Sequence, residues 1–253
     1  MNSASLLRRM LSPMLLLIAW EVCSRMGLLN PQVIPAPSRI LTDLYNLAIS
    51  RELFVALYAS MKRVVSGFAI AVVVGVSIGV LMASSRIAED VIDPFVEFLR
   101  PISPLALLPL AILWFGIGDA SKIFLIALSC CFPVLLNTYA GVKGVDVALV
   151  RAASSLGANR WEIVRNVILP GSIPSILTGV RISWGIALIV IIASEMVGAV
   201  NGIGFMVLDA QQTFRTERLF SGIAIIAAIG YGTDRALRWL RRSLVPWHQE
   251  YRV

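Results

Sequence analysis

The sequence predicts an all-α integral membrane protein with six transmembrane helices, and three observations support that prediction. Of the 253 residues, 58% are hydrophobic and only 15% are charged, whereas a soluble domain is about 25% charged. The mean hydropathy is +0.82. Several uncharged runs approach the ~20 residues that a helix needs to cross a bilayer. This composition excludes a soluble globular enzyme, a disordered chain and a disulfide scaffold.

The expected spans follow the apolar runs in chain order. Residues 64–83, 101–118 and 123–142 carry no charged side chain. Single charges interrupt other runs: Glu21 and Arg25 lie in the first, and Arg181 lies in the fifth. Together the spans form a single transmembrane domain over residues 1–253. We expect them at about 11–29, 64–83, 95–116, 122–141, 173–198 and 219–239.

Basic residues predict the orientation, because Lys and Arg are retained on the cytoplasmic side. With both termini in the cytoplasm, the arginine-rich loop 142–172 and the C-terminal tail also lie inside, and the outer turn 117–121 has no Lys or Arg. The net charge of +7 follows the same rule, so no nucleic-acid partner is expected. The outer segment 30–63 fits less well, but residues 37–58 have helical apolar spacing and are expected to lie along the lipid interface.

Glycines and prolines modify two of the spans. Gly75 and Gly79 form a small-xxx-small pattern that predicts close helix packing. Pro101, Pro104 and Pro109 fall in the third span, where proline frees backbone carbonyls that neighbours or a water-lined cavity must satisfy. Either a broken helix beside a pathway or a kinked packing helix fits this pattern.

The loop 142–172 has the pattern of two short helices joined by a glycine. Ala152, Ala153 and Leu156 share one helical face, and Gly157 follows them. A second amphipathic helix containing Trp161 is expected to end at Leu169-Pro170, because proline disfavours helix at the preceding residue. The small residues of the first helix would form a shallow surface for another protein.

The spacing of this loop resembles the EAA loop of permease subunits in bacterial ABC importers. That pattern is Glu-Ala-Ala, three residues, Gly, nine residues, then Ile-x-Leu-Pro. This chain has Arg151-Ala152-Ala153, three residues, Gly157, nine residues, then Val167-Ile168-Leu169-Pro170. Arg151 and Val167 depart from the pattern, and the arginine removes any polar contact of the Glu. The resemblance implies coupling to an ATPase through Ala152, Ala153, Leu156, Gly157, Ala158 and Trp161.

Three further segments resemble the nitrate/sulfonate/taurine/bicarbonate permeases: Phe98–Asp119, Asn137–Gly144 and Ala193–Gly198. The resemblance implies a type I ABC importer permease fold in the bacterial inner membrane. It also implies a permease homodimer surrounded by membrane lipid, a cytoplasmic ABC ATPase dimer and a periplasmic solute-binding protein. The chain has no G-x-x-x-x-G-K-[ST] phosphate loop. We therefore expect no enzymatic activity and no cofactor on this chain, with ATP and Mg on the partner ATPase.

Charged residues in or beside the spans are candidates for the solute path. Intramembrane charges are costly and usually face a bundle interior or a cavity. Arg181, Glu195 and Arg100 are the candidates, and a cation such as Arg181 would suit an anionic solute. The alternative is that Arg181 and Glu195 each pair with a neighbouring helix for structural reasons.

The expected function is ATP-driven import of a small anionic solute by alternating access, with a sulfonate or taurine first and nitrate or bicarbonate next. The same family with a non-anionic solute is an alternative, as is an ion-driven secondary transporter, although such transporters often show matching halves and none is evident here. A membrane-embedded enzyme lacks support, because the single histidine, His248, lies in the tail. No metal-ligand spacing is present.

Overall fold

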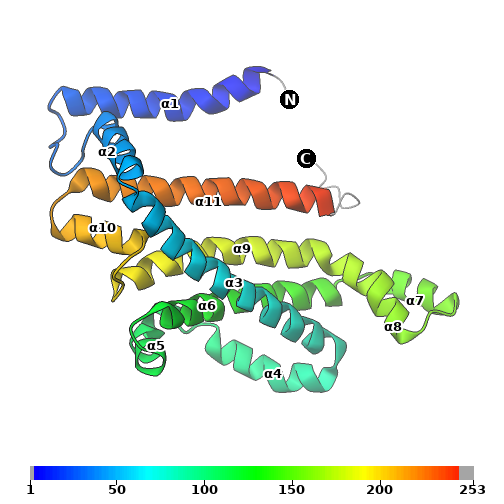
Figure 1. The fold of residues 1–253 in the computed structure, drawn as a ribbon. Coiled ribbons are helices and arrows are strands. Elements are labelled where there is room, and N and C mark those ends of the chain that lie inside the picture. The colour runs from blue at the N-terminus through cyan, green and yellow to red at the C-terminus, as the bar shows by residue number, and fades with distance from the viewer. Residues whose placement is uncertain (1–2, 245–253) are drawn as a thin grey trace. The chain divides into compact units, whose positions relative to one another are not determined.

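The computed structural model describes residues 3–244, with side chains described for residues 11–239. Within that range the secondary structure is helical and contains no strand, which confirms the all-α prediction (Figure 1). The elements in chain order are α1 (Ser3–Arg25), α2 (Pro37–Ile49), α3 (Glu52–Ser84), α4 (Arg86–Leu99), η1 (Pro104–Leu107), α5 (Leu108–Phe115), α6 (Asp119–Lys143), α7 (Val147–Ser155), α8 (Arg160–Ile163), η2 (Val164–Ile168), α9 (Leu169–Met196), α10 (Ile203–Gln212) and α11 (Thr216–Leu244).

The chain divides into two compact units. The first combines Met1–Ala59 with Val200–Ala228, and the second combines Ser60–Ala199 with Ile229–Val253. Within residues 3–244, three helices are long and apolar enough to cross a membrane: α3, α6 and the continuous helix Arg160–Met196. The bent pair α4 and α5 is a fourth candidate. A multi-pass membrane protein is therefore confirmed, and the count of six spans stays a prediction.

The expected span 95–116 is broken rather than continuous. Helix α4 ends at Leu99, before Pro101, and the chain resumes helical structure at Pro104. The axes on the two sides of the break differ by 84°. Proline cannot donate a backbone hydrogen bond and restricts the residue before it, so the prolines place the break. The break itself is confirmed, and its position beside a solute pathway stays a prediction.

The expected helix end at Leu169-Pro170 is wrong, because the helix runs on through Pro170. The turn before the proline is a π-helix, η2, in which the Leu169 N–H donates to the Val164 carbonyl five residues back. Proline normally interrupts a helix because its ring clashes with the carbonyl four residues earlier and it has no N–H. A wider π turn relieves that conflict, so α8 and α9 become one helix.

The segment 37–58 contains the expected amphipathic helix, but the helix is shorter than predicted. Helix α2 buries Ile40 and Leu47 and ends at Ile49. Arg51 then adopts a φ of 62°, and α3 begins at Glu52, well before the predicted span start at residue 64. The position of α2 at the lipid interface stays a prediction.

In the second unit α6 and α9 lie side by side and α3 packs closely against α6 (Figure 1). A Cβ atom at Gly75 would lie 2.9 Å from the Cys131 carbonyl oxygen, and one at Gly79 would lie 2.7 Å from the Leu135 carbonyl oxygen. The small-xxx-small prediction of close packing is therefore confirmed. The buried cluster at this contact includes Val64, Ala71, Leu125, Ile126, Ala187 and Ile191.

Two glycines of α9 give a matched test of the packing between α9 and α6. A Cβ atom at Gly179 would lie 2.7 Å from the Asn137 Cβ and 2.9 Å from the Pro133 carbonyl oxygen, whereas one at Gly185 would meet no atom within 4 Å. We expect Gly179→Ala to destabilise the protein by about 1–3 kcal/mol through overpacking. Gly185→Ala should leave stability unchanged or raise it, because alanine favours helix by about 0.5–1 kcal/mol over glycine. Melting temperatures in detergent check this, and equal shifts for both variants would contradict it.

Candidate functional site

The loop 142–172 folds as the predicted helix–turn–helix, and local signals set both helix ends at the turn. Gly157 has a φ of +83°, the left-handed conformation that commonly terminates helices. Its N–H donates to the Ser154 carbonyl at 3.0 Å, and the Ala158 N–H donates to the Ala153 carbonyl at 3.1 Å. These bonds satisfy the last carbonyls of α7 and reverse the chain.

Helix α8 begins with a complete capping box. The Asn159 side-chain oxygen accepts from the Glu162 N–H at 2.9 Å, and the Glu162 carboxylate accepts from the Asn159 N–H at 2.8 Å. Reciprocal bonds of this kind satisfy two N–H groups at a helix start. The turn between α7 and α8 is therefore fixed on both sides of Gly157.

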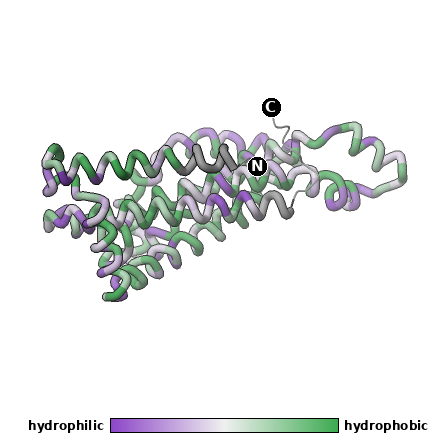
Figure 2. The backbone as a smooth tube through the Cα atoms, turned by 90° about the horizontal axis from the view of Figure 1, so that it is seen from above, coloured by the Kyte–Doolittle hydropathy of each residue, from purple (hydrophilic) through white to green (hydrophobic). Residues whose placement is uncertain are grey.

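The turn presents apolar side chains to the outside of the unit. Leu156 is 89% exposed and Trp161 is 68% exposed. Figures 1 and 2 show α7 and α8 extending beyond the ends of α6 and α9, with hydrophobic and hydrophilic residues alternating along them. The expected coupling surface therefore lies on an element that protrudes from the unit, and its contact with an ATPase stays a prediction. The structure brings together all six residues predicted for coupling: Ala152, Ala153, Leu156, Gly157, Ala158 and Trp161.

Sequence reasoning missed one member of this surface. Leu149 is 57% exposed on α7, two helical turns before Leu156. The seven-residue spacing between these two leucines, which places them on one helical face, is a signal that could have identified it.

Arg181 pairs with a carboxylate of α11. Its Nε lies 2.6 Å from the Asp234 Oδ1, and Arg238 also pairs with Asp234, at 2.8 Å. Arg100 lies elsewhere, exposed at the end of α4. The structure thus gives Arg181 the structural partner that one alternative required, and it does not bring Arg181, Arg100 and Glu195 together.

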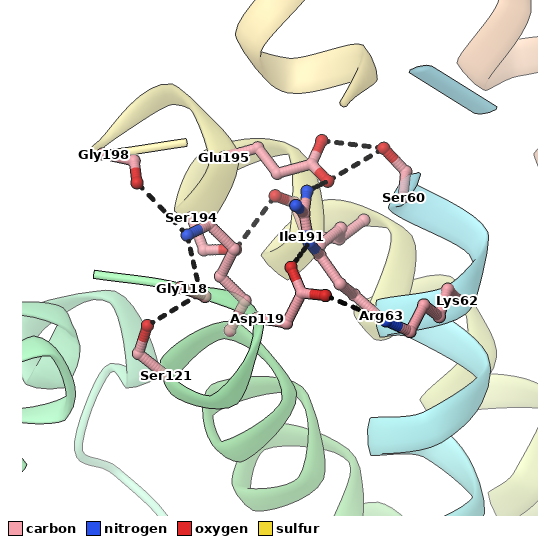
Figure 3. A network of polar contacts seen from close by, with 11 residues as sticks. Ser60, Lys62, Arg63, Gly118, Asp119, Ser121, Ile191, Ser194, Glu195 and Gly198 are labelled. Carbon is pink, nitrogen blue, oxygen red and sulfur yellow. Dashed lines mark hydrogen bonds and ion pairs between the residues drawn. The ribbon is translucent and has the colours of Figure 1, made fainter. Parts of the chain in front are cut away.

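Glu195 lies fully buried in a network of polar contacts that joins the end of α9 and the start of α6 to residues 60–63 of α3 (Figure 3). The Arg63 Nη1 lies 2.6 Å from the Glu195 Oε1, and the Ser60 hydroxyl donates to the carboxylate at 2.8 and 2.9 Å. The Arg63 Nε pairs with Asp119 at 2.6 Å. A buried carboxylate is therefore matched by a buried guanidinium, as burial of charge requires.

Lys122 extends this network with a second buried cation. Its ammonium donates to the carbonyl oxygens of Gly118 at 3.0 Å and Gly198 at 3.3 Å. These bonds join the residue before α6 to the chain just after α9. Sequence reasoning missed these residues because Arg63 and Asp119 flank predicted spans and Lys122 is the first residue of one, where a charge needs no explanation. The one available signal was that a buried Glu195 needs a cationic partner.

The chain matches known transport proteins over most of its length. Residues 71–246 match the family described as the binding-protein-dependent transport system inner membrane component. The taurine transport system permease protein TauC of Escherichia coli is 40% identical over 93% of this chain and 87% of its own length. A putative aliphatic sulfonates transport permease, SsuC of Bacillus subtilis, is 38% identical over 97% and 89%. The bicarbonate transport permease CmpB of Synechococcus elongatus is 33% identical over 90% and 86%.

Solved structures of two ABC transporters have a similar fold. An inward-facing form of the MetNI methionine ABC transporter covers 75% of this chain and 94% of its own, with a TM-score of 0.65 and 17% identity. An amino acid ABC transporter covers 79% and 94%, with a TM-score of 0.60 and 24% identity. These likenesses confirm the predicted importer permease fold.

Proposed function

The chain belongs to the family of binding-protein-dependent transport system inner membrane components, and on that basis we propose that it forms the membrane pathway of an ATP-driven importer for a small organic sulfonate. It is an ABC importer permease whose relatives are transport subunits rather than enzymes. The similarity to permeases named for taurine and for aliphatic sulfonates, over nearly the whole chain, is the observation that carries the choice of solute. Bicarbonate, for which another relative is named, ranks next, together with nitrate from the resemblance of the sequence segments.

The exposed loop supports a coupling role for α7 and α8. Because α8 continues into α9 without a break over Arg160–Met196, a force on Trp161 acts directly on the helix that carries Arg181 and Glu195. An ATPase that binds the loop differently in its two nucleotide states would thereby favour one orientation of α9. Such differential contact is the physical requirement for alternating access driven by a partner.

The proposed assembly has two copies of this permease, a cytoplasmic ATPase dimer that holds ATP and Mg, and a periplasmic solute-binding protein. The permease lies in the bacterial inner membrane with both termini in the cytoplasm. The single coupling loop per chain supports two copies, since an ATPase dimer offers two docking sites. Native mass spectrometry of the detergent-solubilised complex tests this, and one copy or a second permease sequence would contradict it.

Uptake into vesicles that hold the complete transporter tests the solute. We expect ATP-dependent uptake of labelled taurine or an alkanesulfonate to exceed that of nitrate and bicarbonate. Failure of all four together with uptake of a neutral or cationic compound would overturn the solute assignment and leave the importer function intact.

The same vesicles test a role of Arg181 in the solute path. If Arg181 attracts the anionic solute along its path, Arg181→Gln should reduce uptake in an assembled complex, and Arg181→Lys should retain more of the uptake. If its pairing with Asp234 is structural, both variants should lower assembly together.

A further inference from the structure

The first unit contains a cavity that neither the coupling loop nor the charged network uses. Its volume is about 380 Å³, within the range of about 300–1,000 Å³ for small-molecule sites. It lies among the turn at residues 50–52, the start of α3, the start of α10 and Arg218 of α11. With both chain termini inside, residues 30–63 and 199–218 face the outer side, where solute enters.

Part of the lining of this cavity is apolar. Val55 and Ala56 of α3 and Phe205 and Met206 of α10 line it, and Ala56 and Met206 are themselves buried. An aliphatic carbon chain would exclude water from these side chains. The cavity therefore suits a solute with carbon atoms between its polar groups better than a small inorganic anion.

The lining also carries charges of both signs. Arg218 pairs with Glu52 at 2.6 Å, so these two charges neutralise each other. Arg51 and Asp209 also line the cavity, and among the described side chains neither takes part in an ion pair. One cation and one anion in the same cavity are thus available for a ligand.

The backbone of Arg51 adopts a strained conformation of the kind that is often found at functional sites. Its φ of 62° lies in the left-handed region, which residues other than Gly, Asn and Asp rarely adopt. Strained residues concentrate at ligand and functional sites, where the surrounding structure holds them in place. Here the strained residue, Arg51, is one of the residues that line the cavity.

We propose that this cavity binds a short aliphatic zwitterion, with Arg51 holding a sulfonate and Asp209 holding an ammonium group. Taurine carries both of these groups, whereas a plain alkanesulfonate, nitrate and bicarbonate have no ammonium group. The proposal rests on the proposed function, because that function supplies the sulfonate class. The proposal adds that the permease itself selects solutes that carry an amino group.

Equilibrium binding of labelled taurine to the detergent-solubilised permease–ATPase complex, without the binding protein, tests the proposal. We expect Asp209→Asn to weaken taurine binding about tenfold, the loss of roughly 1.4 kcal/mol, and to leave ethanesulfonate binding unchanged. Arg51→Gln should weaken both ligands, and Arg51→Lys should recover part of the affinity. Asp43→Asn, a carboxylate variant of the same unit outside this cavity, should change neither.

The two proposals fail in different ways. If vesicles take up taurine but the wild-type complex does not bind it, or if Asp209→Asn weakens both ligands equally, the cavity assignment is wrong and the proposed function stands. If vesicles take up no sulfonate at all, the proposed solute class is wrong and the zwitterion assignment falls with it.

Discussion

Replacing Gly157 by valine is expected to reduce ATP-driven uptake at least tenfold while the membrane part of the permease stays folded. Gly157 has a φ of +83°, and a Cβ there would meet no atom within 4 Å. The effect therefore comes from the backbone, because a β-branched residue resists a left-handed conformation. Without that conformation the turn no longer holds Leu156 and Trp161 in their present relation, so the proposed docking surface for the ATPase is lost. Vesicle uptake and recovery of the ATPase with tagged permease measure the two consequences.

The matched control is Gly157→Asn, because asparagine tolerates the left-handed region far better than valine does. We expect Gly157→Asn to keep most of the uptake and to recover the ATPase normally. Normal uptake by Gly157→Val, or equal losses in both variants, would contradict the role of this turn. An unchanged melting temperature in both variants would show that the effect is confined to the loop.

The helix–turn–helix could be predicted from sequence because its determinants are local. Gly157 ends one helix and Asn159 with Glu162 starts the next, and both signals lie within a few residues of the structure that they set. The continuation through Pro170 could not be predicted in the same way. It depends on a π turn whose hydrogen bonds have no residue signature, so the usual effect of proline was the better expectation.

The buried network around Glu195 could be predicted only in part from the sequence. Glu195 was evident as a charge inside an apolar run, and its need for a cation follows from its burial. Its partner Arg63 lies 132 residues away, on a helix that extends well beyond the predicted span. Nothing local distinguishes Arg63 from the neighbouring Lys62, which is exposed. Only the packing of α3 against α6 and α9 decides which cation is buried.

Removing the buried cation is expected to be among the most destabilising single changes in the chain. In Arg63→Leu, the fully buried Glu195 loses the guanidinium that lies 2.6 Å away. Breaking a buried ion pair on one side typically destabilises by about 3–5 kcal/mol, because the remaining charge is uncompensated. We expect a large fall in the melting temperature of the purified permease and a matching loss of folded protein.

Two further variants separate this electrostatic effect from loss of packing. Arg63→Leu combined with Glu195→Met removes both charges and should recover much of the lost stability, since replacing a buried pair by apolar side chains is often close to neutral. Arg181→Leu removes a guanidinium at the same 2.6 Å distance from a carboxylate, but Asp234 keeps Arg238 at 2.8 Å. It should therefore destabilise much less than Arg63→Leu. If the double variant melts at as low a temperature as Arg63→Leu alone, the network stabilises the protein through side-chain packing and not through charge.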